Sequence, residues 1–266
     1  MFEHVLIVGV GLLGGSLGLA LRSRGLAKRV VGIGRSSDRL QKAVDVGAIT
    51  EFQLLDDPWR ADGGLVVLAA PVEQIGLLLE AHRAKISDDT IVTDVGSTKS
   101  RIVESCEQIL GAGNNFVGSH PMAGSHHTGV MHADRDLFEN RVCIVTPTER
   151  TGAQSTARVV DLWQGVGMKV IQLSPEEHDR LAARTSHLPH MAASALCSLL
   201  GRNTNPSLTD LVGAGFRDTT RLAAGGPELW AEICQHNQRE IASAIGELIE
   251  ELTLLRDLLD RRDFAE

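Results

Sequence analysis

The chain has 266 residues, 43% of them hydrophobic, so it is long enough to bury a core, and its composition argues against disorder. Its formal net charge is −8 at pH 7 and its basic residues are scattered, which argues against nucleic acid or a membrane surface as a partner and favours a small molecule. The N-terminus lacks the basic segment of a signal peptide, and no apolar run reaches the roughly 18 residues that a membrane helix needs.

The cysteines indicate the compartment in which the protein works. They are far apart and fall into no zinc-binding spacing. We therefore expect reduced thiols, buried as small apolar side chains, in a cytoplasmic protein; these residues are Cys106, Cys143, Cys197 and Cys234.

Short runs rich in valine and isoleucine alternate with amphipathic stretches through the first part of the chain. Such runs, bounded by Gly, Pro or Asp, are typical of buried strands. We expect strands within residues 4–10, 29–35, 64–70, 90–96, 115–120, 141–147 and 168–173, and helices within 14–25, 38–47, 72–85 and 152–167. This alternation predicts a mostly parallel sheet with crossover helices.

The pattern changes at Ser174, after which it is helical throughout. Residues 174–200, 207–223 and 226–262 have helical periodicity, and no strand-like run lies among them. We therefore predict two domains, an α/β domain over 1–173 and an all-α domain over 174–266.

The last predicted helix is long and carries an apolar stripe. Ile241, Ile245, Leu248, Leu252 and Leu255 recur at spacings of three and four residues. The stripe could pack within the helical domain, but a helix of this length more readily buries it against a second subunit. We expect a homodimer.

A glycine-rich segment, GVGLLGGS, follows the first predicted strand and opens the first predicted helix. This is the context of the dinucleotide-binding fingerprint, in which glycines let the backbone approach a pyrophosphate at a helix N-terminus. We expect a Rossmann-type domain that binds its cofactor with Gly9, Gly11, Leu12, Leu13 and Gly14. The alternative is a glycine-rich turn that only closes the helix against the strand.

The end of the second predicted strand bears on the choice between NAD and NADP. An NAD site usually places Asp or Glu there to bind the ribose hydroxyl. This chain instead has Arg35 and Ser36 after Gly34, and a guanidinium with a hydroxyl suits a 2′-phosphate. The segment favours NADP, although Arg35 could stack on the adenine in a site that accepts NAD.

Polar residues follow two of the later strands. Asp94, Ser97 and Lys99 come after one of them, and His120 ends the next, at the edge of the sheet where ligands bind. The chain has no tyrosine, which excludes dehydrogenases that need a Tyr general acid. A histidine is then the first candidate for proton transfer, because its pKa near 6.5 matches the working pH.

Five motifs together resemble one enzyme family. GVGLLGGS, DVGSTK, GSHPMAG, SHLPHMAA and GFRDTTRLA, in this order, are similar to the motifs of the prephenate and arogenate dehydrogenase family of tyrosine biosynthesis. The resemblance covers nearly the whole chain. It implies oxidative decarboxylation of a cyclohexadienyl substrate, with hydride transfer from the 4-hydroxyl carbon to a nicotinamide and loss of the ring carboxylate as carbon dioxide.

The resemblance also implies roles for residues of the first domain. His120, in the family's HPMAG motif, is implied as the catalytic residue, hydrogen-bonded to the 4-hydroxyl; a neutral imidazole is a suitable acceptor for the proton that leaves as the carbonyl develops. Ser97 matches the serine that contacts this histidine and the hydroxyl, although it could also cap the following helix. Asp94 is assigned to the cofactor side of the site.

In the helical domain the resemblance implies a substrate pocket. Arg221 should bind a substrate carboxylate, and Asp218, three residues earlier on the same helix face, could hold it in place. His187 and His190 are implied as pocket residues. Pro189 can start or kink the helix there, and if His190 lies in a first turn, the positive end of the helix dipole would favour its neutral form. A structural histidine remains the alternative for His187.

The chain departs from the family at His126, where many relatives carry an acidic residue. An acidic group would favour the ammonium of arogenate, whereas a histidine would not, so we expect prephenate as the substrate. A metal site at His120, His126 and His127 is not expected, because their spacing does not match a helix face and no Asp, Glu or Cys lies among them.

Two other functions stay open on the sequence. One is a different nicotinamide enzyme, such as a β-hydroxyacid or imino-acid reductase with a lysine catalyst. The other is a non-catalytic dinucleotide sensor that binds a partner protein through its helices. The chain ends soon after the long helix, at Glu266, so we expect any inhibition by tyrosine to act at the active site itself.

Overall fold

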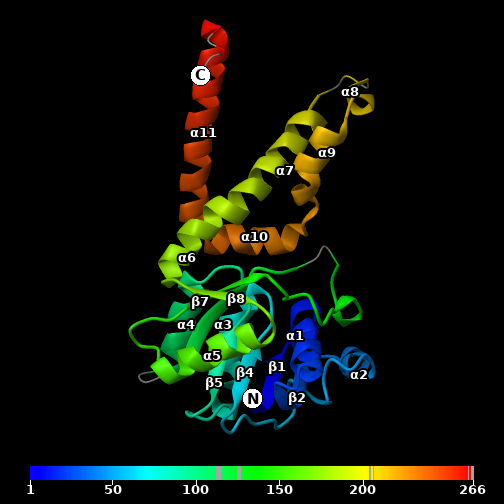
Figure 1. Cartoon of the computed structure of the whole chain (residues 1–266), viewed down its shortest axis with the longest axis vertical. Coiled ribbons are helices and arrows are strands. Elements are labelled where there is room, and N and C mark those ends of the chain that lie inside the picture. The colour runs from blue at the N-terminus through cyan, green and yellow to red at the C-terminus, as the bar shows by residue number, and fades with distance from the viewer. Residues whose placement is uncertain (112–114, 125–126, 204, 206, 263, 265–266) are drawn as a thin grey trace. The chain divides into compact units, whose positions relative to one another are not determined.

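The computed structural model describes residues 1–111, 115–124, 127–203, 205, 207–262 and 264, apart from the side chain of residue 209. It divides into two compact units, Met1–His178 and Asp179–Glu266, and each is considered by itself (Figure 1).

The first unit is built on a sheet of eight strands in the order β3-β2-β1-β4-β5-β6-β7-β8. All neighbours pair in parallel except β6 and β7, which are antiparallel. The strands are β1 Phe2–Val8, β2 Ala27–Gly34, β3 Glu51–Leu54, β4 Leu65–Leu68, β5 Ile91–Asp94, β6 Phe116–Pro121, β7 Val142–Thr146 and β8 Lys169–Gln172. The predicted mostly parallel sheet is confirmed.

Helices cover both faces of this sheet (Figure 1). On one face α1 (Leu12–Ser23), α2 (Ser37–Asp45) and α5 (Ala153–Gly165) bury a core that contains Leu17, Leu40 and Trp163. On the other face α3 (Val72–His82) and α4 (Ser100–Leu110) bury Ile75 and Ile102. Short 3-10 turns lie at Arg83–Lys85 (η1) and Val130–His132 (η2). Strands that are buried on both faces explain the continuous apolar runs in the sequence.

The parallel arrangement positions the site. Because β1, β4, β5 and β6 all run in one direction, their carboxyl ends meet at one edge of the sheet. Gly9, which follows β1, and His120, near the end of β6, therefore lie toward the same edge. Strands β4 and β5 separate them.

The second unit is entirely helical in its described residues. It begins within α6 (Pro175–Ala182), which continues through a π-helical turn, η3 (Ala183–His187), into α7 (Leu188–Gly201). The other elements are α8 Ser207–Asp210, α9 Ala214–Thr220, η4 Arg221–Ala224, α10 Pro227–His236 and α11 Gln238–Arg261. A small core holds Ala183, Ile233, Ile241 and Ala244. Among the described helices, none is long and apolar enough to cross a membrane.

Candidate active site

The glycine segment forms a tight turn between β1 and α1. Gly9 has a φ of +96°, and a Cβ there would lie 2.4 Å from the carbonyl oxygen of Ala69. A Cβ on Gly14 would lie 2.2 Å from the carbonyl oxygen of Gly9, so both glycines are required by close packing of the backbone. A Cβ on Gly11 would meet no atom within 4 Å. Space is therefore left at Gly11 alone of these three.

That space lies at the start of α1. Gly11 is the N-cap, and no side chain of the described structure caps the helix. The first backbone N–H groups of a helix have no partner within it, and here they belong to Leu12, Leu13 and Gly14. Open space above free N–H groups at the positive end of a helix fits the pyrophosphate of a dinucleotide. The predicted cofactor residues of this turn are thus arranged as such a site requires.

The end of β2 carries the second set of predicted cofactor residues. Arg35 is exposed, and no ion pair to its guanidinium is formed among the described residues. Ser36 is the N-cap of α2, where its hydroxyl oxygen accepts a hydrogen bond from the N–H of Arg39 at 3.4 Å. Because the hydroxyl of Ser36 is the acceptor in that bond, its proton can still be donated to a ligand. Arg35 is available to an anionic group.

His120 is buried near the end of β6, with 8% of its surface exposed. Its Nδ1 lies 2.8 Å from Nε2 of His178, a fully buried residue of α6, and the two rings meet edge to face. A hydrogen bond at one imidazole nitrogen determines which protonation state the other adopts. The pair therefore sets the chemistry available at Nε2 of His120.

Ser97 and Asp94 lie in the segment that follows β5. Ser97 is half-buried and is not the cap of α4, because the helix begins at Ser100 and its N-cap is Lys99. The alternative role as a helix cap is therefore wrong. The carboxylate of Asp94 is fully buried and contacts the ammonium of Lys99, so any effect of Asp94 on the cofactor passes through the backbone that it holds; its role at the cofactor stays a prediction.

His190 packs against an indole in the second unit. Its ring stacks on Trp230, with centroids 3.5 Å apart and planes 9° from parallel, and it is 6% exposed. Burial lowers the pKa of His190 from its ordinary value, and a hydrogen bond with the backbone of Leu222 opposes this shift. The expected neutral form is therefore favoured, but by burial. Of the two alternatives for Pro189, a free helix start is wrong, because α7 continues directly from the π-helical turn η3.

His187 approaches the same indole from its edge, with ring centroids 6.0 Å apart. Its Nδ1 lies 3.3 Å from the side-chain amide nitrogen of Asn237, which also donates to the carbonyl oxygen of Asp179. His187 is 1% exposed. This anchoring fits the structural alternative for His187, while its predicted role in the pocket stays a prediction.

Arg221 is exposed and begins η4, next to the residue whose backbone bonds to His190. The helix α9 ends at Thr220, so Asp218 and Arg221 do not continue on one α-helical face as expected. No ion pair joins the two among the described residues, and both side chains face solvent. Their predicted roles toward a substrate carboxylate stay predictions.

The histidine-rich loop after β6 does not gather its histidines. His126 lies outside the described residues. His127 is exposed and stacks on His132, with centroids 4.5 Å apart, whereas His120 is buried beside His178. Across the part of the chain that the structure describes, no group of three or more His, Cys, Asp or Glu side chains is placed to hold a metal ion.

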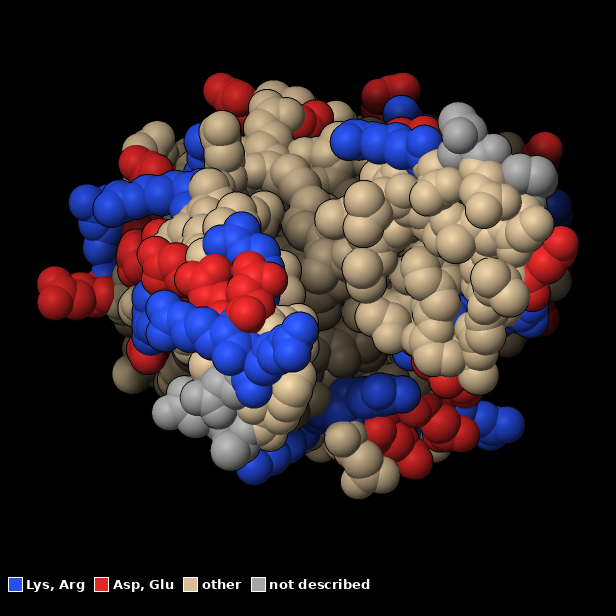
Figure 2. Space-filling view, turned by 90° about the horizontal axis from the view of Figure 1, so that it is seen from above, with Lys and Arg blue, Asp and Glu red and all other residues tan. Residues whose placement is uncertain are grey.

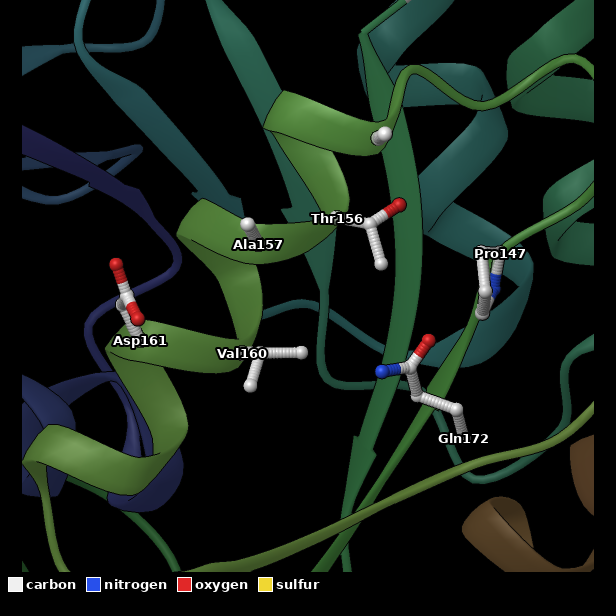
Figure 3. A pocket seen from close by; sticks show the side chains of 7 residues that line it. Pro147, Thr156, Ala157, Val160, Asp161 and Gln172 are labelled. Carbon is white, nitrogen blue, oxygen red and sulfur yellow. The ribbon is translucent and has the colours of Figure 1, made fainter.

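A pocket of about 520 Å³ lies elsewhere, between α5 and the edge strand β8 (Figure 3). Asp161 is its only ionisable lining residue, and none of the predicted site residues contributes to it. Its lining comprises Pro147, Ala153, Thr156, Ala157, Val160, Asp161 and Gln172. It is therefore a less suitable catalytic site than the edge that carries His120.

Two residues of these arrangements were missed in the sequence. His178 lies in the charged stretch PEEHDR, which reads as a solvated helix face, so nothing local marks it as buried. Trp230 is one of three tryptophans in the chain, and its place beside a predicted helix start was the only signal.

Comparisons with known proteins identify relatives over the whole chain. The family model described as prephenate dehydrogenase, nucleotide-binding domain, matches residues 17–172, and that described as prephenate dehydrogenase, dimerization domain, matches 174–266. The prephenate dehydrogenase of Bacillus subtilis is 36% identical over 99% of this chain and 72% of its own length. The cyclohexadienyl dehydrogenase of Zymomonas mobilis is 31% identical over 99% of this chain and 90% of its own.

Solved structures give the same result. Prephenate dehydrogenase from Aquifex aeolicus, in complex with hydroxyphenyl propionate and NAD+, has a TM-score of 0.91 and 34% identity, over 98% of this chain and 92% of that one. Synechocystis arogenate dehydrogenase has a TM-score of 0.86 and 30% identity, over 98% of this chain and 94% of that one. At these identities the likeness extends beyond the fold.

The glycine turn generates a first prediction. Gly11→Ala places a methyl group in open space, so thermal unfolding should stay within about 2 °C of the unchanged protein, while the Kd for NAD or NADP rises at least tenfold. Gly14→Ala is the matched control, because its methyl group meets backbone and should destabilise the fold by about 1–3 kcal/mol. Calorimetry of unfolding and of binding would measure both, and unchanged affinity in Gly11→Ala would contradict the placement of the pyrophosphate.

The burial of His190 generates a second prediction. Because the pKa of His190 is lowered in the folded state, the unfolded chain binds more protons near that pKa, so the free energy of unfolding should fall as the pH drops below about 6.5. His190→Gln should lose part of this dependence. Urea unfolding at pH 7.5 and pH 5.5 measures the difference, and an identical pH dependence in the two proteins would exclude this effect.

Proposed function

Because the chain belongs to the prephenate dehydrogenase family, we propose that it converts prephenate to 4-hydroxyphenylpyruvate by oxidative decarboxylation, with hydride transfer to a nicotinamide dinucleotide. The observation that carries this proposal is the buried contact of 2.8 Å between His120 Nδ1 and His178 Nε2. It supplies one imidazole whose second nitrogen can serve as a proton acceptor.

The tautomer of His120 is central to the mechanism. We propose that Nδ1–H of His120 donates to Nε2 of His178, so that Nε2 is the unprotonated nitrogen of His120. That nitrogen accepts the proton of the substrate 4-hydroxyl as the ring carbon is oxidised. His178 keeps the imidazole oriented and is a positioning residue. Ser97, half-buried after β5, is proposed as a second hydrogen-bonding group for the hydroxyl.

The reaction balances with these groups. A nicotinamide dinucleotide held at the glycine turn would supply the acceptor for the hydride of the carbon that bears the 4-hydroxyl. The 4-hydroxyl proton passes to His120, and the C–O bond of that carbon becomes the carbonyl of a dienone. The bond between the ring and its carboxylate then breaks, and carbon dioxide leaves. The electron pair of that bond completes the aromatic ring, and the ring oxygen regains a proton from His120.

We propose that the helical unit binds the substrate carboxylates. Arg221 is an exposed, permanently charged group that can bind a carboxylate through two parallel hydrogen bonds. His190 is favoured in its neutral form by burial against Trp230, so it can hydrogen-bond to substrate without adding charge. We propose that Asp218 and His187 belong to the same substrate pocket as Arg221 and His190.

The dinucleotide is proposed to be NADP in preference to NAD. The segment after β2 has no carboxylate at Arg35 or Ser36 to bind a ribose 2′-hydroxyl, and Arg35 is exposed there. A guanidinium favours a 2′-phosphate. The Aquifex aeolicus relative was solved in complex with NAD+, so the proposed preference for NADP rests only on Arg35 and Ser36 of this chain.

Prephenate is proposed over arogenate on the strength of His126, which replaces an acidic residue common in relatives. The two substrates differ in the side chain, which is a keto acid in prephenate and carries an ammonium in arogenate. A neutral or cationic imidazole offers no favourable charge to an ammonium. Arogenate remains the second candidate, because relatives named cyclohexadienyl and arogenate dehydrogenase match nearly the whole chain.

We also propose that the helical unit forms a homodimer through α11. Its first half is packed, with Ile241 5% and Ala244 0% exposed. From Ile249 onward the helix exposes more than half the surface of five large aliphatic side chains, Ile249, Leu252, Leu254, Leu255 and Leu259. The view from above in Figure 2 shows groups of charged side chains beside a wide uncharged area. A solvated helix rarely carries so many exposed aliphatic groups, and the matched dimerization model supports this use.

Steady-state rates with both substrates and both cofactors test the proposed activity. We expect reduction of NADP with prephenate to have the highest kcat/KM, followed by the other combinations. His120→Gln should lower kcat at least a thousandfold while cofactor affinity is retained, because the proton acceptor is lost.

The same measurements discriminate the alternatives. If the protein turns over neither prephenate nor arogenate, the proposed function is overturned and a different nicotinamide enzyme is favoured. Full activity in His120→Gln, with tight cofactor binding, would favour a dinucleotide sensor. A kcat/KM that is higher with NAD than with NADP would contradict only the proposed role of Arg35 and would leave the proposed reaction intact.

The dimer is tested by changing the exposed stripe. Leu252→Glu combined with Leu255→Glu should convert a dimer to monomers of 28.6 kDa, because buried carboxylates would be costly at the interface. Light scattering after size exclusion measures the mass. Leu77→Glu, on α3 of the first unit and 58% exposed, is the matched control and should leave the dimer intact. A monomeric unchanged protein at 10–100 μM would contradict the proposal.

A further inference from the structure

The pairing between β5 and β6 ends just before the catalytic histidine. The parallel ladder joins Val92 with Phe116 and Thr93 with Val117, and goes no further. On the other side of β6, the residues from Gly118 to Pro121 pair in antiparallel fashion with β7. The backbone of Ser119, the residue before His120, therefore faces the end of β5 without a regular ladder.

Two side chains take the place of that ladder. The N–H of Ser119 donates to Oδ1 of Asp94 at 3.0 Å, and the carbonyl oxygen of Ser119 accepts from Nζ of Lys99 at 2.9 Å. The other carboxylate oxygen, Oδ2, accepts from the N–H of Gly96 at 2.8 Å and from Nζ of Lys99. Side chains thus hold both backbone polar atoms of Ser119, the residue before His120.

The hydroxyl of Ser119 adds a third attachment. Its Oγ donates to the carbonyl oxygen of Asp94 at 2.5 Å and accepts from Nε1 of Trp163, in α5, at 3.0 Å. It also lies 2.9 Å from Oγ1 of Thr93. Every polar atom of Ser119 therefore has a partner, in β5, in α5 or at Lys99.

The cost of this arrangement indicates that it serves more than stability. Asp94 and Lys99 are both completely buried, and removing two charges from water costs about as much as, or more than, their attraction returns. Apolar residues of similar volume often hold a core as well as or better than a buried ion pair. What apolar residues cannot supply is an acceptor for the backbone N–H and a donor for the backbone carbonyl of Ser119.

We propose that Asp94 and Lys99 are positioning residues that set the place of the His120 imidazole through the Ser119 backbone. This inference rests on the proposed function, in which His120 accepts the substrate proton. Lys99 is then neither a proton donor nor a ligand of substrate, because its ammonium is held by Asp94 and Ser119. Its loss should affect the rate of the chemical step and spare the binding of substrate and cofactor.

The double variant Asp94→Asn with Lys99→Met tests the proposal. It removes both charges together, so no single buried charge is left unpaired, and the amide oxygen introduced by Asp94→Asn can still accept from the Ser119 N–H. The Ser119 carbonyl loses its donor. We expect kcat for prephenate to fall at least tenfold, with the KM values for prephenate and cofactor within threefold of the unchanged protein and the thermal midpoint within about 5 °C.

Glu107→Gln is the matched control. Glu107 lies in α4, the helix that Lys99 caps, is 7% exposed and contacts the hydroxyl of Thr148 away from Ser119. Its kcat should stay within twofold. A folded double variant that keeps kcat within twofold would overturn the proposal, and so would a double variant and a Lys99→Gln variant that both fail to fold, since the pair would then serve stability. Failure of the proposed function itself is distinct, because the unchanged protein would turn over neither substrate.

Discussion

The hydrogen bond between His120 and His178 is the interaction on which the account of this site depends. It joins the end of β6 to α6 over 2.8 Å, and both rings are buried. An imidazole has two nitrogens, and a partner at one of them decides whether the other is a donor or an acceptor. This one buried contact thus fixes the orientation of the His120 ring and the roles of its two nitrogens, which a histidine in an open loop would lack.

The remaining parts of the first unit bring this imidazole to the right edge. Parallel strands place the glycine turn after β1 and His120 near the end of β6 at the same side of the sheet. The glycine turn offers free N–H groups and space at Gly11. The buried side chains of Asp94 and Lys99 bind the backbone N–H and carbonyl of Ser119, the residue before His120. The α/β layers therefore bring the proposed dinucleotide site and the proposed proton acceptor to one edge of the sheet.

Much of this could be predicted from sequence, and the failures have physical causes. Valine and isoleucine runs identified the buried strands, but such runs do not encode direction, so the antiparallel β7 was not anticipated. Strand β3, Glu51–Leu54, was missed because it is short and half-exposed at the sheet edge. The glycine spacing identified the turn because close packing there admits no side chain. His178 could not be found, because its burial depends on contacts between residues 58 apart.

The most direct test is the tautomeric state of His120 by two-dimensional 15N–1H NMR of the protein labelled at histidine, with the signals assigned by comparison with His120→Gln. At pH 8 we predict that Nδ1 of His120 carries the proton and that Nε2 is unprotonated. A proton on Nε2, with Nδ1 accepting from His178, would contradict it, since the nitrogen that must receive the substrate proton would already be occupied.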